Sequence, residues 1–180
     1  MPESASVISV IASVVSAIGG AIACIAAFRS AGHAKEAFEE SQKADKRHAL
    51  RQLSLTAHQV VVEVERIKWL AQGLKVAYKT LVVFCGATGG SRVTIFTKEI
   101  EEKVGVAETL ENKSSPFIEL QVALLNGPLE EISGREVRMS QHLAEAVALR
   151  EKLEIELADI QAKNATHQEI AIHNSKGKHA

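Results

Sequence analysis

A seven-residue repeat of apolar side chains is the feature that most constrains how this chain folds. Between residues 50 and 85, apolar residues recur at alternating steps of three and four over about five heptads. The repeat consists of Leu50, Leu53, Ala57, Val60, Val64, Ile67, Ala71, Leu74, Tyr78, Leu81 and Cys85. Such spacing aligns one face of an α-helix into a coiled-coil-like seam. We expect its Leu, Ile and Val members to carry the helix–helix contact.

Breaks divide the rest of the chain into further helical legs. Clustered glycines interrupt the helix near residues 86–92, a Ser-Pro step interrupts it near 112–116, and an Asn-Gly-Pro step ends it near 126–128. The legs 49–85, 93–127 and 129–165 contain 37, 35 and 37 residues. Amphipathic legs of nearly equal length with short connections predict an all-α protein with a long-helix antiparallel bundle.

Local signals refine this prediction. We expect Ser115 to cap a helix that resumes with Pro116 at its first position. We expect Gly127 to end that helix in the left-handed conformation. In the third leg Arg150 interrupts an otherwise apolar seam, and its side chain is expected to extend into solvent. The apolar seam of that leg comprises Met139, Leu143, Ala146, Leu153, Leu157 and Ile160.

The glycine-rich break has two alternative interpretations. The β-branched segments 80–85 and 92–97 flank it, as the strands of a β-hairpin would. The run from Val82 to Gly90 resembles the strand and glycine-rich turn that open dinucleotide-binding domains of the short-chain reductase type. However, Arg92 stands where that family needs a third glycine, and the heptad repeat continues through the first would-be strand. We therefore interpret the glycines as a helix-breaking loop.

An apolar run near the N-terminus predicts a membrane anchor. Residues 5–28 contain no Asp, Glu, Lys, Arg or His. As a helix, this run is about 36 Å long, which exceeds the roughly 30 Å hydrocarbon core of a bilayer. We therefore expect one transmembrane helix within residues 1–28. A signal peptide cleaved after Ala21-Ile22-Ala23 and a buried core helix are the alternatives.

The charges that flank this run predict its orientation. Basic residues follow it and none precedes it. The nearest are Arg29, Lys35, Lys43, Lys46 and Arg47. Because positive charges favour the cytoplasmic side, we expect a single-pass protein of the cell membrane with its N-terminus outside and its body in the cytoplasm.

Small side chains recur along one face of the predicted anchor. They are Ser9, Ser13, Ser16, Gly20, Ala23 and Ala27, at steps of three and four. Small residues let two helices approach closely in lipid, where van der Waals contact drives association. This face predicts self-association within the membrane.

These features predict four segments. Residues 1–28 form the anchor, and the polar, mixed-charge residues 29–48 form a juxtamembrane helical stalk. Residues 49–170 form the bundle, and residues 171–180 form a disordered tail, because the end of the chain carries few apolar side chains.

Composition and motifs argue against catalysis and against nucleic acid as a partner. The formal net charge is -1, with 21 basic and 22 acidic residues, and the two cysteines are too few for a four-cysteine zinc site. Isolated histidines such as His142 are expected at the surface, and His167, His173 and His179 do not share a helix face. Trp69 and Cys85 are interpreted as packing residues. We predict no catalytic, cofactor-binding or metal-binding residues.

The sequence therefore predicts a membrane-anchored scaffold, adaptor or sensor that acts through helix–helix association. Its partners are the membrane and either a second copy or another protein, with no enzymatic activity, cofactor or small-molecule substrate. The alternative is a lysis or toxin-like effector built from oligomerised transmembrane helices. In that case expression dissipates the membrane potential, and replacing Ser16 and Gly20 with Ile abolishes the effect.

Overall fold

The computed structural model describes the backbone of residues 3–86, 90–119 and 122–176. Side chains are described for the same ranges, except those of residues 3–23, 25, 122–123 and 174–176. The chain divides into two units, residues 1–47 and 48–180.

Helices make up the described chain. The elements are α1 (Glu3–Phe84), α2 (Ser91–Ser114), the short 3₁₀ helices η1 (Ser115–Phe117) and η2 (Val122–Asn126), and α3 (Leu129–Lys176). No strand occurs in these ranges, which confirms the all-α class. The segments 80–84 and 92–97 are helical, so neither the β-hairpin nor the strand of a dinucleotide-binding domain is present there.

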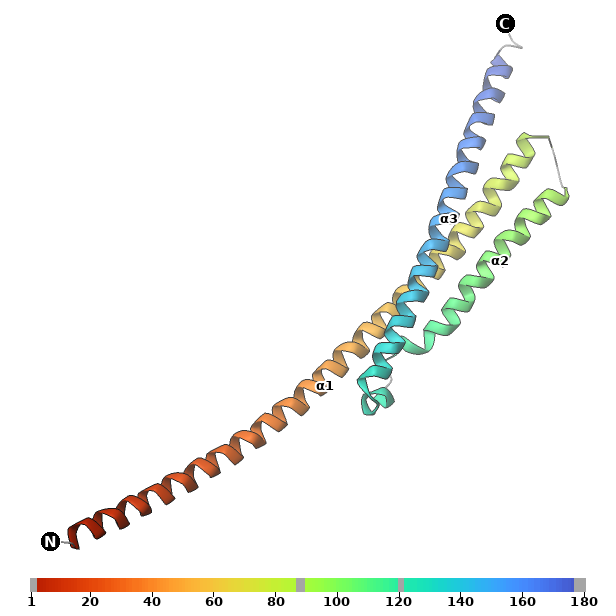
Figure 1. Ribbon diagram of the computed structural model, residues 1–180. Coiled ribbons are helices and arrows are strands. Elements are labelled where there is room, and N and C mark those ends of the chain that lie inside the picture. The colour runs from red at the N-terminus through yellow and green to blue at the C-terminus, as the bar shows by residue number, and fades with distance from the viewer. Residues whose placement is uncertain (1–2, 87–89, 120–121, 177–180) are drawn as a thin grey trace. The chain divides into compact units, whose positions relative to one another are not determined.

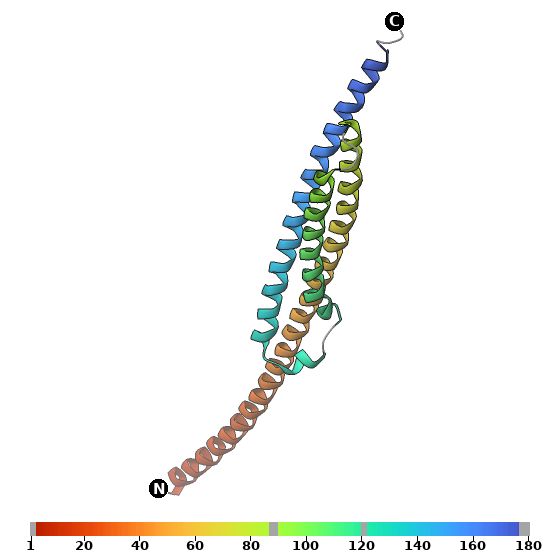
Figure 2. The same cartoon turned by 90° about the vertical axis from the view of Figure 1, so that its right-hand side faces the viewer.

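In the unit 48–180, the second half of α1, α2 and α3 lie side by side (Figures 1 and 2). Cross-helix contacts fix their directions. Lys68 contacts Glu111 and Lys75 contacts Glu101, so α1 and α2 are antiparallel. Asn164 and Arg150 of α3 contact Ala77 and Glu63 of α1, so α1 and α3 are parallel. The chain therefore runs up, down and up through a three-helix bundle.

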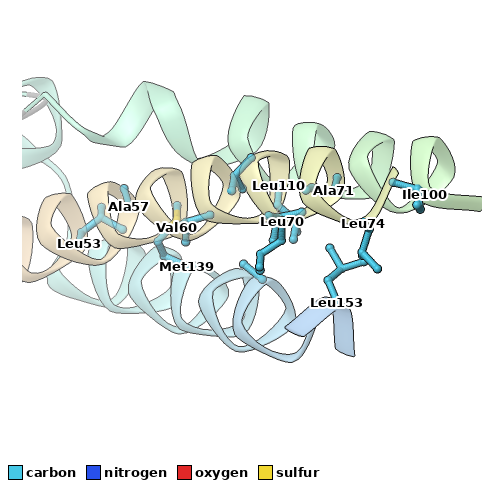
Figure 3. Close-up of a cluster of buried hydrophobic side chains, with 14 of the residues drawn as sticks. Leu53, Ala57, Val60, Leu70, Ala71, Leu74, Ile100, Leu110, Met139 and Leu153 are labelled. Carbon is cyan, nitrogen blue, oxygen red and sulfur yellow. The ribbon is translucent and has the colours of Figure 1, made fainter. Parts of the chain in front are cut away.

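The core of this bundle lies between the three apolar seams (Figure 3). Every residue of the α1 repeat from Leu50 to Leu74 is buried. Ile100, Ala107 and Leu110 of α2 face them, and Ile132, Met139, Ala146, Leu153 and Ile160 of α3 complete the cluster. Burying a Leu, Ile or Val side chain stabilises a fold by roughly 1.5–3 kcal/mol, so these seams are the main source of stability.

The second leg is shorter than the sequence predicts. α2 ends at Ser114, and the resumed helix expected after Ser115 is replaced by η1 and η2. Ser114, and not Ser115, stands at the N-cap of η1. The Ser54 hydroxyl of α1 donates a hydrogen bond to the Ile118 carbonyl and ties this connection to the bundle. A proline ring removes one backbone donor, which favours short turns over a continuous helix here.

Of the two glycine breaks, the first agrees with expectation and the second differs from it. Gly86 adopts the left-handed conformation, with φ of 71°, and ends α1. Gly127 does not have a positive φ, so the left-handed conformation expected there is wrong. Its backbone N–H instead donates to the Leu124 carbonyl at 3.1 Å, as η2 closes with a 3₁₀-type turn.

The last helix is longer than expected. α3 continues to Lys176, so residues 171–176 are helical and not part of a disordered tail. Extending an existing helix adds one hydrogen bond per residue fixed, without a new nucleation step. Residues 177–180 of the predicted tail lie outside the described chain.

In the unit 1–47, α1 has polar side chains that pair along its exposed surface. His33 pairs with Glu36 at 3.8 Å and Lys35 with Glu39 at 4.0 Å, one turn apart. Within the described residues, none of the helices combines the length and the hydropathy that crossing a bilayer requires. Most of the predicted anchor, residues 1–28, has side chains outside the described set.

Candidate functional site

The structure places the seam residues of α1 inside the bundle. Leu50, Leu53, Val60, Val64, Ile67 and Leu74 are at most 3% exposed. Leu81 is half-buried and packs against the edge of the core. This face already has two neighbouring helices, so it is not available to a further partner.

Of the small-residue face predicted for the anchor, only Ala27 has a described side chain, and it is exposed. Ser9, Ser13, Ser16, Gly20 and Ala23 lie outside the described side chains. The same alternation of small residues continues beyond Ala27, again at steps of three and four. Its further members, all exposed, are Ser30, Ala34, Ala37, Ser41 and Ala44.

A second apolar stripe runs along the opposite side of α1. Five large apolar side chains recur there at intervals of seven residues and remain exposed. They are Leu55 (57% exposed), Val62 (38%), Trp69 (73%), Val76 (65%) and Val83 (61%). At about 100° per residue, these positions lie on the side of the helix opposite the seam. We call these five residues the outer stripe.

The outer stripe corrects the interpretation of Trp69. The sequence predicts that this side chain packs beside the seam, but it is the most exposed of the five. The sequence contains a signal for the outer stripe, a second repeat with one apolar residue every seven residues, or about every two helical turns. A repeat with one apolar position per heptad is a weaker signal than the seam, because the seam fills two positions in every heptad.

Polar side chains separate the outer stripe from the two neighbouring helices. Lys68 pairs with Glu111 of α2 at 2.8 Å and with Glu65 at 2.9 Å. The hydrogen bond to Glu111, followed by that to Glu65, raises the pKa of Lys68 above its usual value. Lys75 pairs with Glu101 of α2 at 3.0 Å. Glu111 and Glu101 therefore bridge α2 to α1.

Arg150 corrects another expectation. Its Nε lies 2.7 Å from Glu63 Oε2 of α1, and its other nitrogens contact Glu154 and Glu151. The hydrogen bond to Glu154 is the main cause that raises the pKa of Arg150. The side chain thus bridges α3 and α1 and does not simply extend into solvent, because Glu63 lies at the same level of the parallel helix.

Cys85 is exposed at the end of α1 and not buried as a core residue. Its Sγ lies 3.8 Å from His167 Nε2 of α3. Two ligands are too few for a metal site, and the described part of the chain contains no group of three or more metal-ligating side chains. The pair offers no further polar group that would direct a reaction.

Comparison with known proteins finds no relative: no family model, curated protein or solved structure matches the chain.

Proposed function

We propose that this protein is a membrane-anchored interaction protein that works by helix–helix association with a second copy of itself. The observation that carries the proposal is the outer stripe of α1. Five exposed apolar side chains, one per heptad along the same side of α1, form a narrow apolar face that the bundle leaves uncovered and that a second helix can cover.

The energetics favour a contact that forms only when two copies are confined together. Full burial of a Val or Leu side chain contributes roughly 1.5–3 kcal/mol, so partial burial of the outer stripes of two copies contributes on the order of 10 kcal/mol. Association of free molecules costs about 4–15 kcal/mol. These terms are similar, so the stripe alone supports weak association. Tethering both copies in one membrane raises their effective concentration and favours the paired state.

The apolar run at residues 5–28 supports the proposed anchor, because it has the length and the lack of charge that a spanning helix needs. Two anchors inserted in the same direction make the copies parallel. The sequence register agrees with parallel pairing: Ser13, Gly20 and Ala27 each precede Leu55 by a whole multiple of seven residues. These three small residues and the outer stripe therefore follow the same heptad position.

The basic residues after the run place the body on the cytoplasmic side in this proposal. A C-terminal dual reporter, fluorescent in the cytoplasm and enzymatically active only outside, tests it. We expect a fluorescent product in the membrane fraction. A soluble fluorescent product contradicts the anchor, and an active external reporter contradicts the orientation.

The association itself is tested with the only tryptophan of the chain. The full chain is reconstituted in vesicles at increasing protein-to-lipid ratio, and quenching of Trp69 fluorescence by acrylamide is measured. We expect quenching to decrease as the ratio rises, because pairing covers the outer stripe. In a Val62→Lys, Val76→Lys variant, quenching should stay high at every ratio.

Ile155→Lys on α3 provides the matched control, since Ile155 is apolar and 71% exposed but lies on another helix. This variant should behave like the unmodified chain. Equal quenching of the unmodified chain at every ratio contradicts self-association through the outer stripe. So does an equal effect of the α1 and α3 substitutions.

A further inference from the structure

A second surface feature lies at the corner where α2 passes through η1 and the connection turns back into α3. A cavity of about 310 Å³ is present there. Its lining comprises Lys113, Phe117, Arg135, Arg138, Met139 and His142. No acidic side chain belongs to this lining. The cavity lies on a different part of the bundle from the outer stripe.

Several polar groups at this corner lack partners. Arg135 Nε and His142 Nδ1 are buried, and neither forms a hydrogen bond within the described chain. The Ser114 hydroxyl, next to Lys113 in the chain, is fully buried and equally unpartnered. Buried polar groups in folded proteins are nearly always hydrogen-bonded, so a cluster of exceptions calls for an explanation. His142, predicted to be a simple surface residue, is half-buried here.

The charges around the cavity are unbalanced. Three basic side chains line it, and the one ion pair that any of them forms in the described chain joins Arg135 to Glu131 at 2.7 Å. Arg138 donates from Nε only to the Gly134 carbonyl, at 3.3 Å. Because only one of these three cations is paired, the cluster keeps an excess of positive charge that favours an anion in the space between the side chains.

The position of Arg135 is fixed from two sides. Its guanidinium carbon lies 5.6 Å from the centre of the Phe117 ring, within the range of a cation–π contact. Glu131 holds its terminal nitrogen, one helical turn away. Such a side chain loses little conformational freedom when it binds a ligand, because neighbours already hold it in place.

We propose that this corner is a binding site for a phosphate monoester group. A phosphate offers three terminal acceptor oxygens and about two negative charges, which suits several converging donors better than a carboxylate with two oxygens. Arg135, Arg138 and Lys113 supply the charge and the accessible donors that line the cavity. The same phosphate chemistry occurs on soluble metabolites and on an anionic lipid headgroup.

Titration calorimetry on the full chain in a zwitterionic detergent tests the site. The two probes are glycerol 3-phosphate and dihexanoyl phosphatidic acid below its micellar concentration, which carry the same phosphomonoester with and without acyl chains. We expect saturable binding of one probe molecule per chain. Arg138→Gln should weaken it about tenfold, which corresponds to one charge-assisted hydrogen bond. Lys113→Gln, on a separate helix, should also weaken it.

Lys98→Gln is the matched control, because Lys98 is an exposed lysine near the opposite end of α2. It should leave the affinity unchanged. Binding of both probes identifies the phosphate group itself as the ligand, and binding of the lipid alone identifies a headgroup site. Absence of binding to either probe overturns the proposal. So does equal binding of acetate at the same concentration, or equal weakening by Lys98→Gln.

Discussion

Helix α1 of the bundle has two apolar faces with the same seven-residue period, of which one is buried and the other is exposed. The seam face is buried, with Ile67 and Leu74 fully covered, whereas Trp69 and Val76 on the outer stripe are 73% and 65% exposed. The difference lies in density. Two apolar positions per heptad bind two neighbouring helices, and one position per heptad leaves a narrow stripe that the bundle does not cover. The period of a repeat therefore identifies an apolar face of the helix. The width of that face determines whether other helices of the same chain cover it.

The largest effect that separates the two faces is expected from truncation of a core leucine. Leu74→Ala should lower the free energy of unfolding by about 2–5 kcal/mol, because it leaves a cavity between three helices. Val76→Ala, two residues away, should change it by no more than about 0.5 kcal/mol, because the side chain has no neighbour to lose. Denaturant unfolding of the full chain in detergent, followed by circular dichroism, measures both. Similar losses at the two positions would contradict the distinction between the faces.

A smaller effect is expected at the polar end of the seam. Asn164 is 91% buried, and its Nδ2 donates to the Ala77 carbonyl at 2.9 Å. Asn164→Ala should lower the free energy of unfolding by about 1 kcal/mol, since one intramolecular hydrogen bond is lost. Asn112→Ala, at an exposed position of α2, is the matched control and should be nearly neutral. The same denaturant unfolding measures both variants. An equal change in the free energy of unfolding at Asn164 and Asn112 would contradict a stabilising contribution of the Asn164 contact.

The smallest effect concerns the ion pairs beside the outer stripe. Because Glu111 and Glu65 raise the pKa of Lys68 in the folded state, its contribution is fully present below the unfolded value of about 10.4. It is lost as the pH rises through the higher folded pKa. Lys68→Met should therefore flatten the decline of stability above about pH 10.4. Lys98→Met on α2 should leave the decline unchanged. A decline of the same steepness in the Lys68 variant would exclude this linkage.

The main fold could be predicted from the sequence because a single dense repeat specified it. The heptads from Leu50 to Leu81 indicated a helix with two neighbours, and the Gly86 and Pro128 breaks located two of the connections. Those signals are local, and each depends on residues a few positions apart. The all-α bundle follows from them without knowledge of the tertiary contacts.

The corner between α2 and α3 could not be predicted in the same way. Apolar residues from Phe117 to Leu125 suit a continued helix, but 3₁₀ turns form here and the Ser54–Ile118 contact holds the connection against α1. The basic cavity depends on that turn, because it brings Lys113 close to Arg135, Arg138 and His142. Residues so far apart in the sequence share no periodicity that reveals their contact.

The odd number of passes through the bundle has a mechanical consequence. Since α1 and α3 are parallel, residue 48 and residue 176 belong to opposite ends of the unit 48–180. A pull between these points acts along the helix axes and shears α1 against α3. Shear loads the Glu63–Arg150 and Ala77–Asn164 contacts together, whereas a hairpin pulled at adjacent ends would separate its contacts one at a time. The bundle is therefore arranged to resist tension along its length.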